Sequence, residues 1–217
     1  MKLAISDKIG TVSAEVLQPE QPKAVLVLAH GAGAGMSHPF MKSLSEELSQ
    51  QGIATLRFNF PFIEQKKKRP DFPAVAHQAI EAAIHLAEEM FPDLPLFTGG
   101  KSFGGRMTSQ LLSGKSIPGV YGIVFFGFPL HQPGNPGTER ADHLEKVKLP
   151  MCFVQGTRDA LAEFSLIQEV VKGLKRSRLI SFEGADHSFK AGKQNLIPQI
   201  AKLAGDWMLN IAEKSRG

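Results

Sequence analysis

The sequence has little of what stabilises secreted or membrane proteins. Among its 217 residues there is one cysteine, so no internal disulfide can form and a reducing compartment is expected. Cys152 lies in the apolar run Met151-Cys152-Phe153-Val154, which indicates a buried small hydrophobic side chain and not a reactive thiol. No apolar run approaches membrane-spanning length, and Met1–Asp7 lacks the apolar stretch of a secretion signal. We therefore expect an unprocessed, cytoplasmic protein without a membrane partner.

The sequence also lacks an excess of basic residues spread along the chain. The net charge is +4, and the run Lys66-Lys67-Lys68-Arg69 carries four positive charges, so the remainder (4 − 4) is close to neutral. A nucleic-acid-binding face is therefore not expected. The basic run predicts either a solvated loop or a feature that attracts anionic substrates toward a nearby site.

The composition that remains is that of an ordinary globular domain. Hydrophobic residues make up 42% of the chain and charged residues 21%. A chain of this length can bury roughly 70% of the surface that its unfolded form exposes. Residues 1–217 are therefore expected to form a single domain.

The order of the hydrophobic segments predicts an α/β fold. A strand pair around a turn at Asp7–Gly10 comes first, and short apolar strands then alternate with amphipathic helices. The expected strands are Leu3–Ile5, Thr11–Leu17, Ala24–Ala29, Ile53–Phe58, Leu96–Phe97, Val120–Phe126, Pro150–Gly156 and Arg178–Phe182. The expected helices are Pro39–Gln50, Ala74–Met90, a helix ending at Gly114, Glu163–Leu174 and Leu196–Ala212, and the expected long loops are Asn59–Pro70 and Phe128–Asp142. This order predicts a mostly parallel central sheet with helices on both faces.

One stretch of the sequence has the pattern of a catalytic turn. Gly100-Lys101-Ser102-Phe103-Gly104 matches the Gly-x-Ser-x-Gly nucleophile elbow, a tight strand-to-helix turn whose central residue adopts a strained backbone conformation. The flanking glycines are needed because neighbouring backbone comes too close for a Cβ atom. The helix N-terminus behind Ser102 offers free N–H groups to a developing anion.

Two phosphate-binding motifs compete for the glycine-rich turns. Gly100-Lys101-Ser102 resembles the end of a Walker A motif, but that motif requires a glycine five positions before Gly100, where this chain has Pro95. Gly31-Ala32-Gly33-Ala34-Gly35 resembles a dinucleotide loop, but its third glycine would fall at Met36 and the next strand ends without an acid for a ribose. We expect no cofactor, and we interpret this turn as an oxyanion loop, with a merely flexible turn as the alternative.

Three polar residues follow predicted strands in the order serine, acid, histidine. In parallel sheets the functional residues gather at the carboxyl ends of the strands, and this chain order belongs to one of the triad folds. Ser102 would be the nucleophile, His187 the base, because an imidazole can take up a proton near neutral pH, and Asp159 the group that orients the imidazole. The oxyanion hole would pair the N–H of Phe103 with that of Ala32 or Gly33.

Other acids and histidines compete for these roles. Asp159 would also suit a helix N-cap. Glu183 and Asp186 are rival acids, although Asp186 adjoins His187 and would struggle to reach round to its ring. His131 is a rival base, although it precedes the acid in the chain.

Two further histidines raise the question of a metal site. His77 and His85 lie on one predicted helix, but neither has a ligand partner at metal-binding spacing. We therefore expect no bound metal.

Taken together, these motifs resemble the α/β-hydrolase superfamily, in the small, lid-poor branch near the dienelactone-hydrolase-like proteins. The resemblance spans nearly the whole chain and is carried by Ala29–Gly35, Arg57–Phe62, Lys67–Pro70, Gly99–Met107, Phe128–His131, Gln155–Asp159 and Asp186–Phe189. It implies the α/β-hydrolase fold with a minimal lid or none, and Ser102, Asp159 and His187 as triad. Dienelactone hydrolase itself uses a cysteine nucleophile, so its substrate is not carried over to this chain.

The sequence therefore predicts a serine hydrolase that cleaves a carboxylic ester or related acyl bond of a small or soluble substrate through an acyl-enzyme. No insertion after Val120–Phe126 is long enough for a helical lid, so the pocket is expected to be shallow. Its expected lining is Met36, Phe60, Phe62, Phe128, His131 and Phe189.

Two alternatives to this hydrolase stay open. Some relatives of the group are thought to serve as subunits of protein complexes, so the chain could be a scaffold or binding protein that keeps the fold. A cofactor-free perhydrolase or haloperoxidase activity would use the same three residues.

Overall fold

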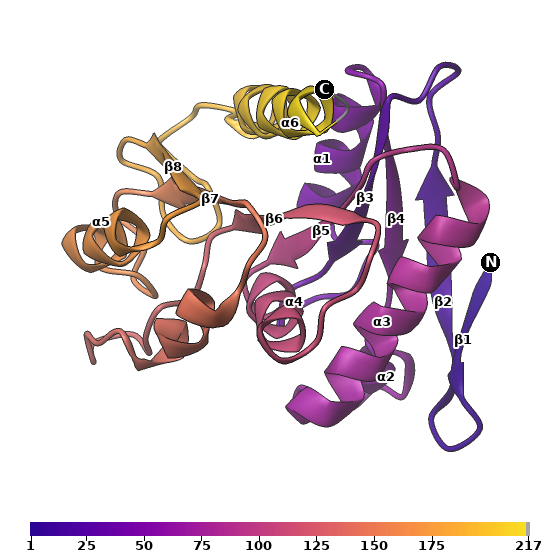
Figure 1. Ribbon diagram of the computed structural model, residues 1–217. Helices are drawn as coiled ribbons and strands as arrows, with labels where there is room; N and C mark the ends of the chain where they lie inside the picture. The colour runs from indigo at the N-terminus through magenta and orange to yellow at the C-terminus, as the bar shows by residue number, and fades with distance from the viewer. Residues whose placement is uncertain (216–217) are drawn as a thin grey trace.

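The polypeptide is built around an eight-stranded sheet with helices on both faces, as Figure 1 shows for residues 1–215, the part that this computed structural model describes. The strands are β1 (Lys2–Ser6), β2 (Gly10–Leu17), β3 (Ala24–Ala29), β4 (Ile53–Phe58), β5 (Leu96–Lys101), β6 (Val120–Phe126), β7 (Met151–Gly156) and β8 (Ser177–Phe182). The helices are α1 (Pro39–Ser49), α2 (Pro61–Glu64), α3 (Pro73–Met90), α4 (Phe103–Gly114), α5 (Phe164–Gly173) and α6 (Ile197–Lys214), with the 3-10 helix η1 (Glu139–Lys146) between β6 and β7.

The strands follow one another across the sheet in the order β1-β2-β4-β3-β5-β6-β7-β8. The β1–β2 and β2–β4 pairs are antiparallel, and every pair from β4 to β8 is parallel. The mostly parallel sheet predicted from the sequence is thereby confirmed. Because the parallel strands all run the same way, the loops that follow β3, β5, β7 and β8 meet at one edge of the sheet.

The central strands are buried on both faces. In β3, Val25 and Val27 belong to the hydrophobic cluster that includes residues of α3 and α4, whereas Leu26 and Leu28 belong to the cluster that includes residues of α1 and α6. Figure 1 shows the same division, with α1 and α6 together on one side of the sheet and α3 and α4 on the other. A strand covered on both sides has no polar face, which explains why its sequence is continuously apolar.

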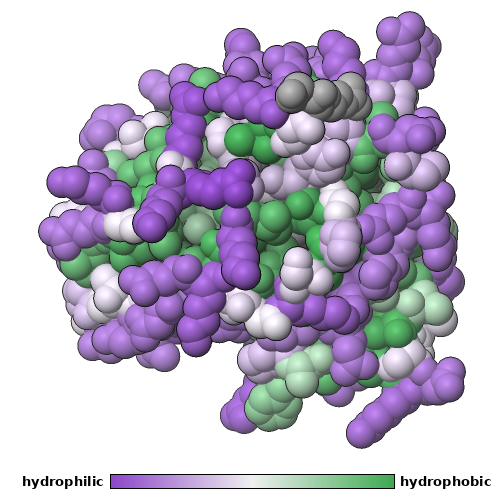
Figure 2. All heavy atoms as spheres, in the orientation of Figure 1, coloured by the Kyte–Doolittle hydropathy of each residue, from purple (hydrophilic) through white to green (hydrophobic). Residues whose placement is uncertain are grey.

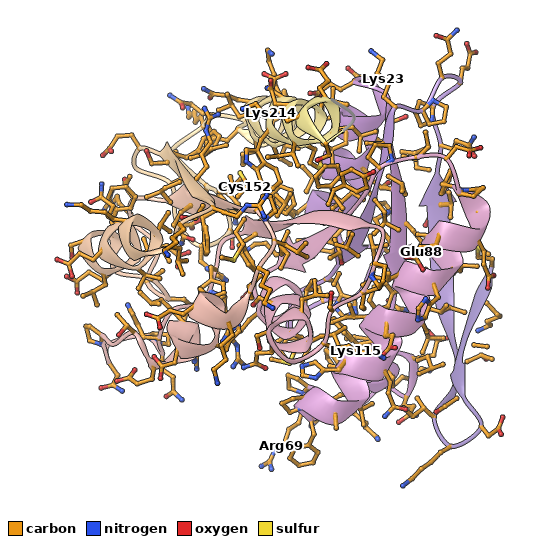
Figure 3. The ribbon with its side chains drawn as sticks, in the orientation of Figure 1. Lys23, Arg69, Glu88, Lys115, Cys152 and Lys214 are labelled. Carbon is orange, nitrogen blue, oxygen red and sulfur yellow. The ribbon has the colours of Figure 1, made fainter. Side chains whose placement is uncertain are left out.

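Cys152 is buried in β7, on the face that α6 covers. It lies in the same cluster as Trp207 of α6, and Figure 3 places it inside the fold below that helix. Burial raises the pKa of its thiol to about 12, so the side chain is a neutral hydrophobic group, as the apolar sequence around it indicates.

The structure differs from the predicted elements in two loops and one strand. The segment 59–70 contains α2, because Pro61 has a helical φ and Phe62 buries its ring. The segment after β6 contains η1, which buries Ala141 and Leu144. β5 continues through the glycines to Lys101, because these residues pair with β3 and β6 on either side.

The exposed surface of the described chain carries neither a membrane helix nor a lid. Within residues 1–215 no helix has the length and apolar character needed to cross a bilayer. In the same range, the connection from β6 to β7 contains only η1 and irregular backbone, so no helical lid covers the edge of the sheet. The face in Figure 2 is mostly hydrophilic, with hydrophobic atoms showing in patches between the charged side chains.

Candidate active site

Ser102 lies in a strained turn between β5 and α4. Its backbone has φ 49° and ψ −114°, a conformation that residues with a Cβ atom rarely adopt. Two hydrogen bonds hold the turn: the N–H of Ser102 donates to the carbonyl of Phe126 (3.2 Å), and the N–H of Arg106 donates to the carbonyl of Ser102 (3.1 Å). A Cβ atom on Gly104 would lie 2.6 Å from the carbonyl oxygen of Ala29, so this position requires glycine. The turn has the geometry of the nucleophile elbow predicted from its sequence.

The imidazole of His187 lies between the other two predicted site residues. Its Nε2 is 2.9 Å from the hydroxyl oxygen of Ser102, and its Nδ1 is 2.7 Å from Oδ2 of Asp159. The carboxylate is an acceptor, so these partners assign the proton to Nδ1 and leave Nε2 to accept from the hydroxyl. The His187 side chain is 22% exposed and that of Asp159 is 0% exposed, so the site opens to solvent on the serine side.

The carboxylate of Asp159 is fixed from three directions. Besides His187, Oδ2 accepts from the side-chain amide of Gln155 (2.6 Å), and Oδ1 accepts from the N–H of Leu161 (2.8 Å). The carboxylate of the rival acid Asp186 instead accepts from the backbone N–H groups of its own loop, those of Ser188 (2.8 Å) and Lys190 (2.9 Å). Asp159 is therefore the acid that contacts the imidazole.

The glycine-rich turn after β3 is held in place by a buried histidine. Nδ1 of His30 donates to the carbonyl of Gly31 (2.7 Å), and Nε2 accepts from the N–H of Phe60 (3.0 Å). Burial lowers the pKa of His30 to about 4, with the Gly31 hydrogen bond opposing the shift, so the ring stays neutral and keeps both bonds. Ala32, two residues after His30, lines both of the cavities that Ser102 lines.

The predicted oxyanion donors lie near Ser102 in the fold. Phe103 is the first residue of α4, so its N–H has no acceptor one turn earlier in the helix. Two cavities meet at Ser102. Ala32 and Phe103 both line one of them, whereas Gly33 lines only the other. This placement favours Phe103 and Ala32 over Gly33 as a pair of donors.

Two cavities of about 390 Å³ each meet at Ser102. One, the histidine-side cavity, is lined by Gly31, Ala32, Gly33, Ala34, His38, Phe40, Met41, Lys101, Ser102, Leu161, His187 and Ser188. The other, the arginine-side cavity, is lined by Ala32, Pro70, Asp71, Pro73, Ser102, Phe103, Arg106, Met107, Pro129, Arg140 and Leu161. A substrate carbonyl at Ser102 could therefore extend one group into each cavity.

A larger cavity of about 650 Å³ lies beside the basic loop and is not lined by Ser102, Asp159 or His187. Lys67, Lys68 and Arg69 line it, and Figure 3 shows Arg69 projecting from the edge of the molecule near the start of α3. It shares Pro70 and Asp71 with the arginine-side cavity. The hydrogen-bonded side chains of Ser102, His187 and Asp159 lie outside this cavity, so it is not the candidate active site.

The aromatic residues predicted to line the pocket are buried behind it. Phe60 and Phe62 are at most 1% exposed and pack around His30 and Phe103. Phe128 is also buried, packed on other rings of the sheet. The prediction that these three contact substrate is wrong for this geometry, because each ring is buried in the hydrophobic core.

The remaining predicted pocket residues also lie outside both cavities. Phe189 is buried and stacks on Phe40, which does line the histidine-side cavity. Met36 is half-buried, and its backbone is tied to β4 through Arg57 (2.8 Å). The ring of His131 is buried and joins two loops. Its Nδ1 lies 2.8 Å from the carbonyl oxygen of Gln132, and its Nε2 accepts from the N–H of Glu163 (2.8 Å). His131 is thus a structural residue and does not replace His187.

Sequence reasoning missed two residues that support the site, Lys101 and Gln155. Lys101 occupies a variable position of the elbow motif, yet its ammonium group donates to the carbonyl of His187 (2.6 Å) and so braces the histidine loop. Burial lowers the pKa of Lys101 to about 8, opposed by the charges of Asp159 and Asp186. Gln155 was one polar residue in an apolar strand, which could have suggested a buried hydrogen-bond partner.

No metal centre is formed within the described part of the chain. Residues 1–215 contain no group of three or more histidine, cysteine, aspartate or glutamate side chains placed to hold an ion. The rings of His77 and His85 lie on α3, and His85 is exposed and contacts Glu88.

Comparison with known proteins matches most of the sequence. A family model described as an alpha/beta hydrolase domain matches residues 22–204. A protein of Mycobacterium tuberculosis named "Putative phosphoribosyl transferase" is 28% identical over 207 residues, which cover 92% of this chain and 44% of that relative. The chain thus spans less than half the length of this relative.

Solved structures share the fold. The dienelactone hydrolase of Anabaena variabilis has a TM-score of 0.77 at 17% identity, with 97% of this chain and 95% of that chain covered. Est1E of Butyrivibrio proteoclasticus, solved with ferulic acid bound, has a TM-score of 0.78 at 15% identity, with 97% and 98% covered. At these identities the likeness extends to the arrangement of strands and helices.

Proposed function

The chain belongs to the alpha/beta hydrolase domain family, and from that premise we propose that it is a serine hydrolase that cleaves a carboxylic ester or related acyl bond of a small or soluble substrate. Membership of the family supports hydrolysis in general. The observation that supports the acyl-enzyme mechanism is the hydrogen-bonded sequence from Ser102 through His187 to Asp159, located where two cavities meet.

In the first half of the proposed reaction, the hydroxyl oxygen of Ser102 attacks the substrate carbonyl carbon while Nε2 of His187 takes its proton. The carbonyl electron pair moves onto the oxygen, which the N–H groups of Phe103 and Ala32 would stabilise. When the tetrahedral intermediate collapses, the bond to the leaving alcohol breaks and His187 gives its proton to the departing oxygen. Asp159 stays ionised and stabilises the imidazolium through Nδ1–H.

In the second half, water replaces the alcohol. Nε2 of His187 takes a proton from the water as its oxygen bonds to the acyl carbon. Collapse breaks the bond to Ser102, and His187 returns the proton to the serine oxygen. The products are the free acid and the alcohol, so the cycle needs no cofactor.

Loss of the Ser102 hydroxyl tests this proposal directly. Ser102→Ala should reduce para-nitrophenyl ester hydrolysis by about 10⁴-fold or more, because the acyl-enzyme can no longer form. A fluorophosphonate probe should label the unmodified chain at Ser102, identified by mass spectrometry of the peptide. Ser113→Ala, on the same helix, is the matched control and should retain both activity and labelling. Full esterase activity in Ser102→Ala would contradict the proposal.

The length of the curated relatives favours a second candidate. Because this chain corresponds to 44% of the Mycobacterium tuberculosis protein, the same unit also occurs within a longer polypeptide, where it could serve as a binding or scaffold domain. The fluorophosphonate probe separates the two candidates. A folded chain that neither reacts with the probe nor hydrolyses any ester of a graded acyl series would favour the scaffold.

A further inference from the structure

The arginine-side cavity brings two guanidinium groups to the wall that contains Ser102. Arg106 lies on α4, one turn after the serine, and Arg140 lies on η1. Arg140 is held by a hydrogen bond from its Nη1 to the carbonyl of His131 (3.0 Å). The backbone carbonyl of His131 thereby positions the Arg140 guanidinium, and the ring of the same residue joins that backbone to Glu163 (2.8 Å).

In the described part of the chain, neither of these two arginines has the carboxylate partner that half-buried arginines usually have. None of the ion pairs formed within residues 1–215 includes Arg106 or Arg140. In the same range, the Nε atom of Arg106 is buried without a hydrogen-bond acceptor. Burial and then the positive charge of Arg140 lower the pKa of Arg106, which shows that the two groups repel. Like charges held together in a partly buried place are costly unless an anion joins them.

The other ionisable groups nearby leave this wall positive. Asp71 lines the same cavity, but its Oδ2 accepts from the N–H of Phe62 (2.9 Å) and burial raises its pKa. His143 is hydrogen-bonded to Ser109 (2.7 Å), and burial followed by the charge of Arg106 lowers its pKa to about 4. A neutral histidine adds no positive charge and one aspartate does not balance two arginines.

The position of His187 decides which part of a substrate enters which cavity. In the proposed reaction His187 protonates the leaving oxygen, so the leaving group must lie beside its ring. His187 lines the histidine-side cavity and is not among the residues that line the other one. The acyl group therefore extends into the arginine-side cavity.

We propose that Arg106 and Arg140 form an acyl-group subsite that takes acyl chains ending in a carboxylate, an inference that rests on the proposed hydrolase function. Guanidinium groups present paired N–H donors that match the two oxygens of a carboxylate. Met107, Pro129 and Leu161 supply apolar wall for the methylene groups between the ester and the anion. The substrate class is thus the half-ester of a dicarboxylic acid, with an uncharged leaving group in the histidine-side cavity.

The experiment compares matched pairs of para-nitrophenyl esters. The anionic members are the hydrogen succinate, glutarate and adipate, and each is paired with an isosteric ester in which an isopropyl group replaces the carboxylate. All share one leaving group, and the enzyme-free rate, which the neighbouring carboxylate raises in the succinate and glutarate esters through a cyclic anhydride, is subtracted for each ester. The ratio of kcat/KM within a pair then measures recognition of the anion, and the adipate pair, in which that cyclisation is disfavoured, is the internal check. The wild-type chain should prefer at least one anionic ester by about tenfold or more, the selectivity that ~1.4 kcal/mol confers.

Variants locate the preference. Arg106→Met and Arg140→Met should each lower the within-pair ratio by about tenfold, because methionine keeps the apolar stem and removes the charge. Arg106→Lys keeps the positive charge and loses the paired N–H donors of the guanidinium. Its within-pair ratio should lie between those of the methionine variants and the wild type, which separates lost recognition from lost folding. Arg178→Gln, on the exposed side of β8, changes the net charge equally and should leave the ratio unaltered.

The failure of this inference is distinguishable from that of the hydrolase proposal. If the esters of every pair are hydrolysed with equal kcat/KM, the anionic subsite is refuted and the hydrolase stands. If no ester is hydrolysed and the fluorophosphonate probe does not react, the hydrolase fails. In that case calorimetric titration of glutarate into the chain and into Arg106→Met decides the subsite: weaker binding by the variant supports it, and equal binding or none refutes it.

Discussion

At the scale of single residues, His30 shows how the core sets the chemistry of the site. Its ring is buried and neutral, with the pKa lowered to about 4, and it joins the turn after β3 to the backbone that follows β4. Protonation would replace the acceptor at Nε2 by a second donor facing the N–H of Phe60. The ring therefore has to stay neutral for the turn to keep its shape.

The stability of the chain should consequently fall on acidification. The unfolded histidine has a pKa near 6.5 and the folded one about 4, so the unfolded state binds more protons between these values. The stability that the neutral ring confers is fully present above pH 6.5 and is lost as the pH falls toward 4. The 2.5-unit difference (6.5 − 4) corresponds to about 3 kcal/mol of unfolding free energy. Urea unfolding at a series of pH values measures this slope.

Two variants assign the slope to this residue. His30→Gln should unfold with a shallower dependence on pH across that window, because glutamine does not titrate. His85→Gln, at an exposed histidine on α3, is the comparison variant. An equal slope in His30→Gln and wild type would show that other groups dominate the acid response.

At the scale of elements, the β5–α4 elbow depends on close backbone approach. A Cβ atom on Gly104 would lie 2.6 Å from the carbonyl oxygens of Ala29 and His30, and one on Gly100 would overlap the carbonyl of Ala29. These neighbours are backbone atoms of the central strand and its turn, which cannot rotate away. Strain at Ser102 is therefore maintained by the packing of α4 against β3.

A single methyl group should separate close approach from helix propensity. Gly104→Ala is expected to destabilise the chain by about 3 kcal/mol, because two carbonyl oxygens of the core would have to move. Gly114→Ala lies at the other end of the same helix, where the described structure has no atom within 4 Å of the added Cβ, and should stabilise by about 0.5 kcal/mol. Urea denaturation of both variants gives the comparison. Equal stabilities would mean that the elbow tolerates a wider turn.

The elements that the sequence predicted best are those whose environment is simplest. β3 is apolar and buried along its whole length, so its hydrophobic run defines both ends. The helix α2 escaped prediction because it has only four residues, too few for a helical period to show. η1 is mostly polar and turns with a shorter period than an α-helix, which hides it among loop residues.

The site was predictable in its chemistry and not in its shape. Ser102, Asp159 and His187 each follow a recognisable strand, and the structure brings the three together as expected, while their catalytic roles stay a proposal. The cavity walls come from the loops after β3, β6, β7 and β8, from the segment before α3, and from α1, α4 and η1. Which aromatic ring points inward depends on packing that no local pattern encodes. Phe60 illustrates the difficulty. It lies beside the turn after β3, as predicted for a pocket residue, but its ring faces the core and not the cavity.

At the scale of the whole molecule, both faces of the sheet contribute to one site. The elbow helix α4 belongs to one hydrophobic cluster, and Phe40 of α1, which lines the histidine-side cavity, belongs to the other. The central strands join the two clusters, since their residues alternate between them. We propose that residues 1–217 fold as a single cooperative domain.

Cooperative folding predicts that probes of the two faces report one transition. Trp207 is the only tryptophan of the sequence and is a buried residue of α6, so its fluorescence reports the face of the sheet that α6 covers. Far-ultraviolet circular dichroism reports the helices of both faces. Their urea midpoints should coincide. A fluorescence transition that precedes the loss of helix would instead indicate that α1 and α6 separate first, as an independent layer.

The inert thiol of Cys152 has a practical consequence. Maleimides react with thiolates at accessible positions, and this sulfur is both buried and held protonated near neutral pH. The native chain can thus be used as a nearly cysteine-free background, without prior mutagenesis. A spin label or dye attached at an introduced cysteine in the basic loop would then report how that loop moves relative to the rest of the molecule.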